Sequence, residues 1–423
     1  MHISTQLDLD VVAVEGHDQL SLLVELTAPT SDTNTTRTPR TLVVVLDRSG
    51  SMAGGRLEGA KKALLELIDR LDPTDRFGLV TFDNATRLAI PAAPLADKAA
   101  AKHRIAAIHA GGSTDLSAGY LRGLQEARSA TVGSGGAGGT VLLISDGHAN
   151  AGVTDPDQLG SVAAKAAGDR ITTTTLGFGL GYDENLLRAI AAGGNGSELF
   201  AEHADDAVAA ISRELDGLLA QTAQAASLLI RMAPTCSGLL LVNEMPSVVT
   251  PSGVQIELGA FYSGEVRKLV ITFDVPGIAA LGLAEIASLD FTWVELPSLV
   301  QQTTTVPVYV NVMPGDQAAG RVPNPVVRTE LAFLRTQRAK RTAAEQMSRG
   351  ESGGAIQDLR QARAMLSDAI ASAPADMHFE LAADLATIDG LADEVNHGDL
   401  ARAAKRAYAD INLKSRKRGS DRP

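Results

Sequence analysis

The sequence predicts a multidomain protein of the α/β plus all-β plus α class, in which an α/β domain is inserted in a β-sandwich and followed by a C-terminal helical region. Three observations lead to this fold class. From Thr41, short apolar runs without polar alternation are each followed by an amphipathic segment, as in a parallel sheet covered by helices on both faces. β-type runs lie before and after this part of the chain. Beyond Pro325 only helical spacing of apolar residues remains.

The composition fits two or three folded domains and argues against several classes of function. The chain has 423 residues, of which 45% are hydrophobic. Its 50 acidic and 38 basic side chains give a formal net charge of −12, so most of the surface would repel a phosphate backbone and nucleic acid is not an expected partner. The single cysteine, Cys236, excludes an intramolecular disulfide framework and a thiolate metal cluster.

The sequence contains no signal for export or membrane insertion. The N-terminus lacks the basic start and apolar block of a signal peptide, and no apolar run approaches the ~20 residues that a membrane span requires. We therefore expect a cytoplasmic protein without a membrane span.

Two paired strands are expected at the N-terminus, within residues 1–35. Apolar and polar residues alternate from Ile3 to Ala28, with a turn at residues 15–18, and a polar linker follows. Because two strands have no core of their own, we expect them to join the sandwich predicted over residues 225–315. The α/β domain of residues 40–222 would then be an insertion between strands of that sandwich.

Within the α/β domain, strands and helices are expected to alternate. Strands are predicted at residues 42–46, 77–82, 140–145, 171–177 and 199–200, and helices at residues 56–71, 97–109, 115–130, 156–167, 184–192 and 204–221. Open sheets of this kind bind ligands at the carboxyl ends of their strands. Functional residues are therefore expected just after Leu46, Phe82, Ser145 and Gly177.

The C-terminal part is predicted to be helical over residues 323–410. Helices are expected at about residues 326–348, 355–372, 377–396 and 400–409. Residues 411–423 are basic, and we expect a disordered, solvated tail there.

Three loops of the α/β domain carry oxygen ligands at expected strand ends. The first, Asp47-Arg-Ser-Gly-Ser51, supplies one carboxylate and two hydroxyls; by itself it is also compatible with an ordinary serine-capped helix start. The second, Gly111-Gly-Ser-Thr114-Asp115, adds a hydroxyl, and the third, Ser145-Asp146-Gly147, adds a carboxylate. Oxygen ligands of this kind suit a hard divalent cation such as Mg²⁺.

The three loops, in this order on successive βα units, resemble the metal-ion-dependent adhesion site of the von Willebrand factor type A (VWA) domain. The resemblance covers about Thr41 to Gln221, close to half of the chain, and extends to Leu71-Asp-Pro-Thr-Asp-Arg-Phe-Gly and Gly177-Phe-Gly-Leu-Gly-Tyr-Asp-Glu-Asn. It implies a Rossmann-like VWA domain, with a parallel sheet flanked by helices, and a non-enzymatic binding function.

The resemblance also implies a ligand set and a mechanism. Ser49, Ser51 and Thr114 would bind Mg²⁺ directly, with Mn²⁺ or Ca²⁺ as alternatives, and Asp47 and Asp146 would act largely through water and hydrogen bonds. With mostly neutral oxygens around it, the cation keeps an open coordination position. An Asp or Glu of a protein partner would complete the coordination.

Three further residues are candidates for a partner-binding rim, namely Arg48, Asp115 and His148. Arg48 could reach an acidic partner or point into solvent, and we favour solvent. His148 follows Asp146-Gly147 and lies either on the rim or in an ordinary loop.

Two alternatives to cation-dependent recognition stay open at this point. The first is a scaffold that binds partners through its helical or sandwich regions while the metal site is unused. The second is a metal-dependent hydrolase, although no G-x-S-x-G elbow or Cys-His pairing stands out. The sequence identifies neither the partner nor the oligomeric state.

Overall fold

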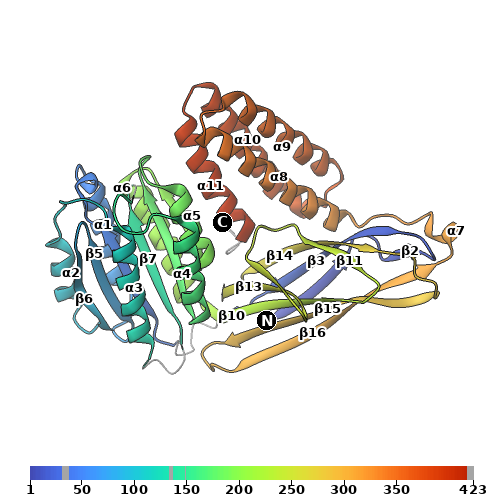
Figure 1. Cartoon of the computed structure of the whole chain (residues 1–423), viewed down its shortest axis with the longest axis horizontal. Coiled ribbons are helices and arrows are strands. Elements are labelled where there is room, and N and C mark those ends of the chain that lie inside the picture. The colour runs from blue at the N-terminus through green and yellow to red at the C-terminus, as the bar shows by residue number, and fades with distance from the viewer. Residues whose placement is uncertain (31–37, 133–136, 148, 417–423) are drawn as a thin grey trace.

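The computed structural model describes residues 1–30, 38–132, 137–147 and 149–416, which form an α/β domain, a β-sandwich and a helical region (Figure 1). The α/β domain lies at one end of the sandwich, and the helices lie across one of its sheets (Figure 1). This arrangement confirms the predicted fold class.

The α/β domain is built on a six-stranded sheet with the strand order β6-β5-β4-β7-β8-β9. Its strands are β4 (Thr41–Asp47), β5 (Arg76–Phe82), β6 (Thr86–Pro94), β7 (Gly139–Ser145), β8 (Ile171–Phe178) and β9 (Asn195–Ala201). Every residue of the central strands β4 and β7 is buried, which explains why their sequences show no polar alternation.

The sheet is mixed rather than parallel, which corrects the prediction for one edge. Strand β6 pairs antiparallel with β5, whereas the other neighbouring strands are parallel. Strand β6 has no signal in the sequence, because all of its residues are partly or fully exposed and it contains Pro91 and Pro94. Proline cannot donate to a ladder, but an edge strand tolerates it.

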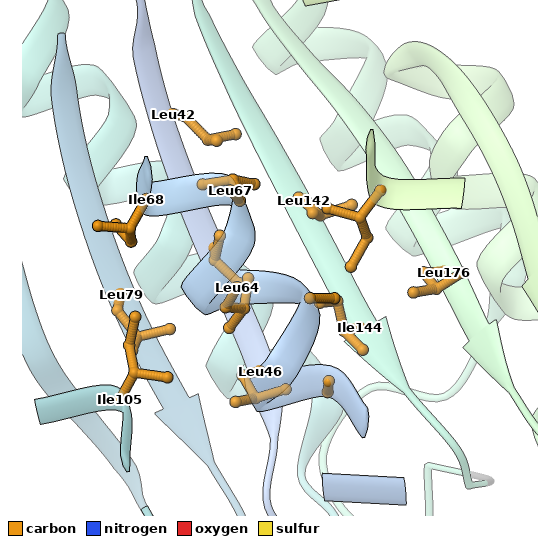
Figure 2. Packing of buried hydrophobic residues seen from close by; sticks show 14 of the residues in the cluster. Leu42, Leu46, Leu64, Leu67, Ile68, Leu79, Ile105, Leu142, Ile144 and Leu176 are labelled. Carbon is orange, nitrogen blue, oxygen red and sulfur yellow. The ribbon is translucent and has the colours of Figure 1, made fainter. Parts of the chain in front are cut away.

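Helices cover both faces of this sheet. They are α1 (Arg56–Arg70), α2 (Lys98–Ala106), α3 (Leu116–Thr131), α4 (Pro156–Gly168), α5 (Glu184–Gly193) and α6 (Ala204–Leu219), and a 3-10 turn spans Gly50–Met52. Alternate residues of β4 point to opposite faces. Leu46 belongs to the same apolar cluster as Leu64 and Leu67 of α1, and Leu64 lies nearest to it (Figure 2). Val45 belongs instead to the cluster formed with residues of α3, α4 and α5. The two apolar layers hold the strand ends, and thus the loops after them, in fixed positions.

The β-sandwich consists of the sheets β1-β3-β14-β11 and β12-β13-β10-β15-β16-β2. Its strands are β1 (His2–Leu7), β2 (Val11–Ala13), β3 (Asp18–Thr27), β10 (Gln221–Met232), β11 (Ser237–Leu241), β12 (Ser247–Thr250), β13 (Gly253–Tyr262), β14 (Val266–Val275), β15 (Gly282–Glu295) and β16 (Gln301–Met313). Strands β1 and β3 pair as predicted, in antiparallel orientation. The sequence predicted a single strand before the turn at residues 15–18, but its last part is the separate, short β2, which joins the opposite sheet beside β16. The α/β domain is therefore an insertion in the sandwich.

The helical region comprises α7 (Gly315–Ala318), α8 (Pro325–Ser348), α9 (Ser352–Ser372), a 3-10 turn (Ala375–Met377), α10 (His378–Asn396) and α11 (Leu400–Arg416). Its core includes Leu23 of β3 and Val270 of β14, so the helices cover the outer face of the smaller sheet. No helix in the described ranges is long and apolar enough to cross a membrane.

Helix α11 reaches Arg416, beyond the point where the sequence predicted a disordered tail to begin at residue 411. Lys414 explains the difference, because its ammonium group donates to the buried Asp384 and forms an ion pair of 2.8 Å with Asp410 one turn earlier. The remainder of the predicted tail, residues 417–423, lies outside the described residues.

The helical region also contacts the α/β domain, through α11. Lys405 Nζ lies 2.7 Å from Glu184 Oε2 and donates to the Tyr182 carbonyl oxygen at 3.0 Å. Asn412 Nδ2 donates to Glu198 Oε2 at 2.6 Å. The chain thus folds back so that its last described helix supports the loop between β8 and α5.

Candidate metal-binding site

The site is centred on Asp47, the last residue of β4. Its side chain is fully buried, accepts a hydrogen bond of 2.7 Å from Ser145 Oγ on Oδ2, and accepts one of 2.8 Å from the Ser49 amide on Oδ1. Burial raises the pKa of Asp47; hydrogen bonds from Ser145 and Ser49 oppose this shift, and the negative charge of Asp146 adds to it. Asp47 therefore links two strand ends, and a nearby cation would stabilise the charged form of its carboxylate.

The hydroxyls of the first loop connect Asp47 to the third loop. Ser49 Oγ and Ser51 Oγ are 3.0 Å apart, and Ser51 Oγ donates to Asp146 Oδ1 at 2.7 Å. Ser49 and Asp146 are buried, whereas Ser51 is exposed. The site therefore has a buried floor and one side that is open to solvent.

Thr114 reaches the same place through backbone contacts between the loops. The Gly111 amide donates to the Arg48 carbonyl oxygen at 2.7 Å, and the Gly50 amide donates to the Gly112 carbonyl oxygen at 3.0 Å. These two bonds hold the first and second loops side by side.

Glycine at position 147 leaves the space between the loops open. A Cβ added there would lie 3.4 Å from Ser51 Oγ and 4.0 Å from Thr114 Oγ1. The structure therefore brings together all five predicted ligands, Asp47, Ser49, Ser51, Thr114 and Asp146.

The residues present fit a hard divalent cation. Three hydroxyl oxygens and two buried carboxylates converge, with no sulfur or imidazole ligand among them, and oxygen is what Mg²⁺, Mn²⁺ and Ca²⁺ prefer. Within the described ranges, no group of three or more His, Cys, Asp or Glu residues is placed to hold a metal. The hydroxyl-rich site is thus distinct from the carboxylate or imidazole cages typical of other metal centres.

Arg48 does not point into solvent, which corrects the preferred prediction. Its guanidinium donates to the carboxylate of Asp83 and, at 3.5 Å, to the His109 carbonyl oxygen. Arg48 thereby connects the first loop to the loop after β5. The sequence does not reveal this structural role, because a charged residue in a loop is usually exposed to solvent.

The other two rim candidates have different outcomes. Asp115 caps helix α3, since its Oδ1 accepts hydrogen bonds from Ser117 Oγ at 2.8 Å and from the Ala118 amide at 3.0 Å. His148 lies outside the described residues.

Sequence reasoning missed Arg56, the first residue of α1. Its Nη1 donates to Asp146 Oδ2 at 2.6 Å and to the Ser51 carbonyl oxygen at 3.2 Å. The available signal was its position, because a helix that starts directly after a metal loop directs its first side chains toward that loop.

Comparison with known proteins identifies the class. The sequence profile of the von Willebrand factor type A domain matches residues 41–214. This segment of the chain is therefore a VWA domain. Domains of this family commonly mediate protein–protein interactions.

Individual relatives extend the comparison. The chain is 32% identical over 227 residues to protein sll0103 of Synechocystis sp., covering 54% of this chain and 52% of that protein. It is 30% identical over 178 residues to inter-alpha-trypsin inhibitor heavy chain H1 of Sus scrofa, covering 40% of this chain and 20% of the relative. The chain thus spans about half, or less, of the length of these curated relatives.

Two solved structures share the fold along the whole chain. A von Willebrand factor type A protein from Catenulispora acidiphila superposes with a TM-score of 0.73 at 16% identity, covering 99% of this chain and 97% of the other. The ArnB paralog VWA2 from Sulfolobus acidocaldarius has a TM-score of 0.66 at 14% identity and covers 99% of both chains. The combination of VWA domain, sandwich and helical region is therefore a shared architecture.

Proposed function

We propose that this protein is a cation-dependent protein-binding module. Ser49, Ser51 and Thr114 hold Mg²⁺ directly, with Mn²⁺ or Ca²⁺ as alternatives, while Asp47 and Asp146 orient the hydroxyls and hold coordinating water. The bound cation supplies an open, strongly positive coordination position, which a carboxylate of a partner fills.

The observation that carries this proposal is the unequal depth of the ligands. Asp47 and Asp146 are buried together with Ser49 and Thr114, and among the five ligands only Ser51 faces solvent. Both carboxylates thus lie on the buried side of the site, and the one ligand that faces solvent is a neutral hydroxyl. A site of this kind leaves more positive charge for an incoming carboxylate than a cage of direct carboxylates would.

The partner that suits this chemistry presents an Asp or Glu side chain. A cationic group is repelled at such a position, and a neutral oxygen gains only an ion–dipole attraction, which is weaker than the attraction between the cation and a carboxylate. The proposed role is recognition without turnover, in line with the interaction function that is common in VWA domains.

Direct titration with Mg²⁺ tests the site, and affinity capture tests its use. Asp47→Ala is the disabling variant. Asp155→Asn is the matched control, because Asp155 is an exposed cap of α4 at the same end of the sheet, and asparagine caps helices equally well.

In calorimetry, the native chain and Asp155→Asn should bind one equivalent of Mg²⁺ that Asp47→Ala does not bind. A partner captured in Mg²⁺ should be lost both in EDTA and with Asp47→Ala. A partner that is retained in all of these conditions would contradict the cation bridge and favour binding through the helical or sandwich regions.

A further inference from the structure

We infer that Arg56 is a second recognition element of the metal site, which weakens cation binding and strengthens binding of an acidic partner. The inference rests on the proposed function and adds to it a residue that determines partner specificity.

Arg56 is anchored by one of its nitrogen atoms only. Nη1 donates to Asp146 Oδ2 at 2.6 Å and to the Ser51 carbonyl oxygen at 3.2 Å. Neither Nε nor Nη2 has a hydrogen-bond partner in the described parts of the chain, and the Arg56 side chain is 40% exposed. A guanidinium has five N–H donors, so most of them remain available to a ligand.

The loop after β8 fixes the orientation of this guanidinium. A Cβ added at Gly179 would lie 3.1 Å from Arg56 Nε and 3.3 Å from its Cζ, so the guanidinium lies close against the backbone there. Gly179 has a φ of +75°, a conformation that favours glycine. The loop therefore supports the guanidinium without a side chain that would displace it.

The charge of Arg56 acts in opposite directions on the two ligands of the site. It bonds the same carboxylate, Asp146, whose other oxygen holds the hydroxyl of Ser51. A positive charge at this place repels a divalent cation, whereas it attracts an incoming carboxylate. Arginine also matches a carboxylate with two parallel N–H donors, which a lysine cannot do.

Loss of the charge at position 56 should therefore change the affinity for the cation and the affinity for a carboxylate in opposite directions. Arg56→Gln removes the charge but keeps a hydrogen-bond donor near Asp146. It should bind Mn²⁺ on the order of tenfold more tightly than the native chain does. It should also need a several-fold higher concentration of a carboxylate ligand. A purely structural role for Arg56, as a support for Asp146, predicts instead that the affinity for Mn²⁺ falls.

The experiment uses the full chain, with Mn²⁺ as the cation and acetate as the carboxylate. Free Mn²⁺ is measured by electron paramagnetic resonance, and acetate binding is followed by the loss of water-proton relaxation enhancement. Arg56→Lys is the matched variant, because it keeps the charge and loses the fork. We expect it to bind Mn²⁺ like the native chain and to bind acetate with intermediate affinity. Circular dichroism in EDTA verifies that all variants are folded.

Each contrary result has a separate meaning. If the native chain binds Mn²⁺ in a manner that depends on Asp47, but Arg56→Gln binds it equally or less tightly, the inference fails and the proposed site stands. If Arg56→Gln binds acetate as well as the native chain does, the specificity role fails. If the native chain and Asp47→Ala bind Mn²⁺ equally, the proposed function fails and the inference fails with it.

Discussion

Two substitutions of Asp47 separate its structural role from its role toward the cation. Asp47 accepts hydrogen bonds from the Ser49 amide at 2.8 Å and from Ser145 Oγ at 2.7 Å, and both of these residues are buried. Asp47→Asn keeps one acceptor for the Ser49 amide, and its amide group can donate to the Ser145 hydroxyl. Asp47→Ala removes the acceptor of both groups, and the Ser145 hydroxyl keeps only a long contact of 3.5 Å from the Gly147 amide.

The structure provides a magnitude for this difference. Each buried polar group that loses its partner costs about 1 to 3 kcal/mol. With two groups affected, Asp47→Ala should be about 2 to 6 kcal/mol less stable than Asp47→Asn in EDTA. Neither variant should gain stability from Mg²⁺, whereas the native chain gains about 2.7 kcal/mol when free Mg²⁺ is 100 times its dissociation constant.

Urea unfolding at neutral pH, in EDTA and in Mg²⁺, measures both effects. The reasoning would be refuted by equal stabilities of the two variants in EDTA, since the hydrogen bonds of Asp47 would then contribute nothing. It would equally be refuted if Mg²⁺ stabilised Asp47→Ala as much as it stabilised the native chain.

Three further predictions concern packing and the contact with α11. Burial raises the pKa of Glu198 to about 7, so its contribution to stability is present below its unfolded pKa of 4.5 and is lost as the pH rises through about 7. Glu198→Gln should remove this pH dependence and stabilise the fold at pH 8 by about 3 kcal/mol, which urea titrations at pH 5 and pH 8 would measure. Lys405→Met removes the buried ammonium that lies 2.7 Å from Glu184, and it should lower stability by about 2 kcal/mol. Helix α11 should then be cleaved faster in limited proteolysis, and an unchanged digestion rate would contradict its support by Lys405. Gly59→Ala would place a Cβ 2.6 Å from the Ala204 Cβ, where α1 meets α6. Chemical denaturation should therefore show a loss of about 1 to 3 kcal/mol in the free energy of unfolding, despite the better helix propensity of alanine. A more stable variant would show that the two helices separate easily.

The sequence predicted those parts of the fold in which burial decides the residue types. Strands β4 and β7 are buried along their whole length, so their uninterrupted apolar runs identify them and also locate the metal loops that follow. The sequence did not predict β6, because its exposed residues form no uninterrupted apolar run. It also failed at the end of α11, whose last turn depends on the contact between Lys414 and Asp384, far apart in sequence.

The same distinction applies to the site. Asp47, Ser49 and Ser51 are close in sequence, and the order of the other two loops along the chain is a pattern that can be read directly. The partners of Arg48 and Arg56 lie on other loops, at Asp83 and Asp146. Because the partners in such pairs are far apart in sequence, no local sequence pattern marks them, and only the structure identifies them.

The central claim is that three hydroxyls hold a cation above two buried carboxylates. An anomalous difference map from crystals of the full chain soaked in Mn²⁺ tests it most directly. The account predicts one strong peak in contact with Ser49 Oγ, Ser51 Oγ and Thr114 Oγ1, at about 2.0 to 2.3 Å from each oxygen atom. Crystals that show Mn²⁺ elsewhere on the chain and no peak between these three hydroxyls would contradict it.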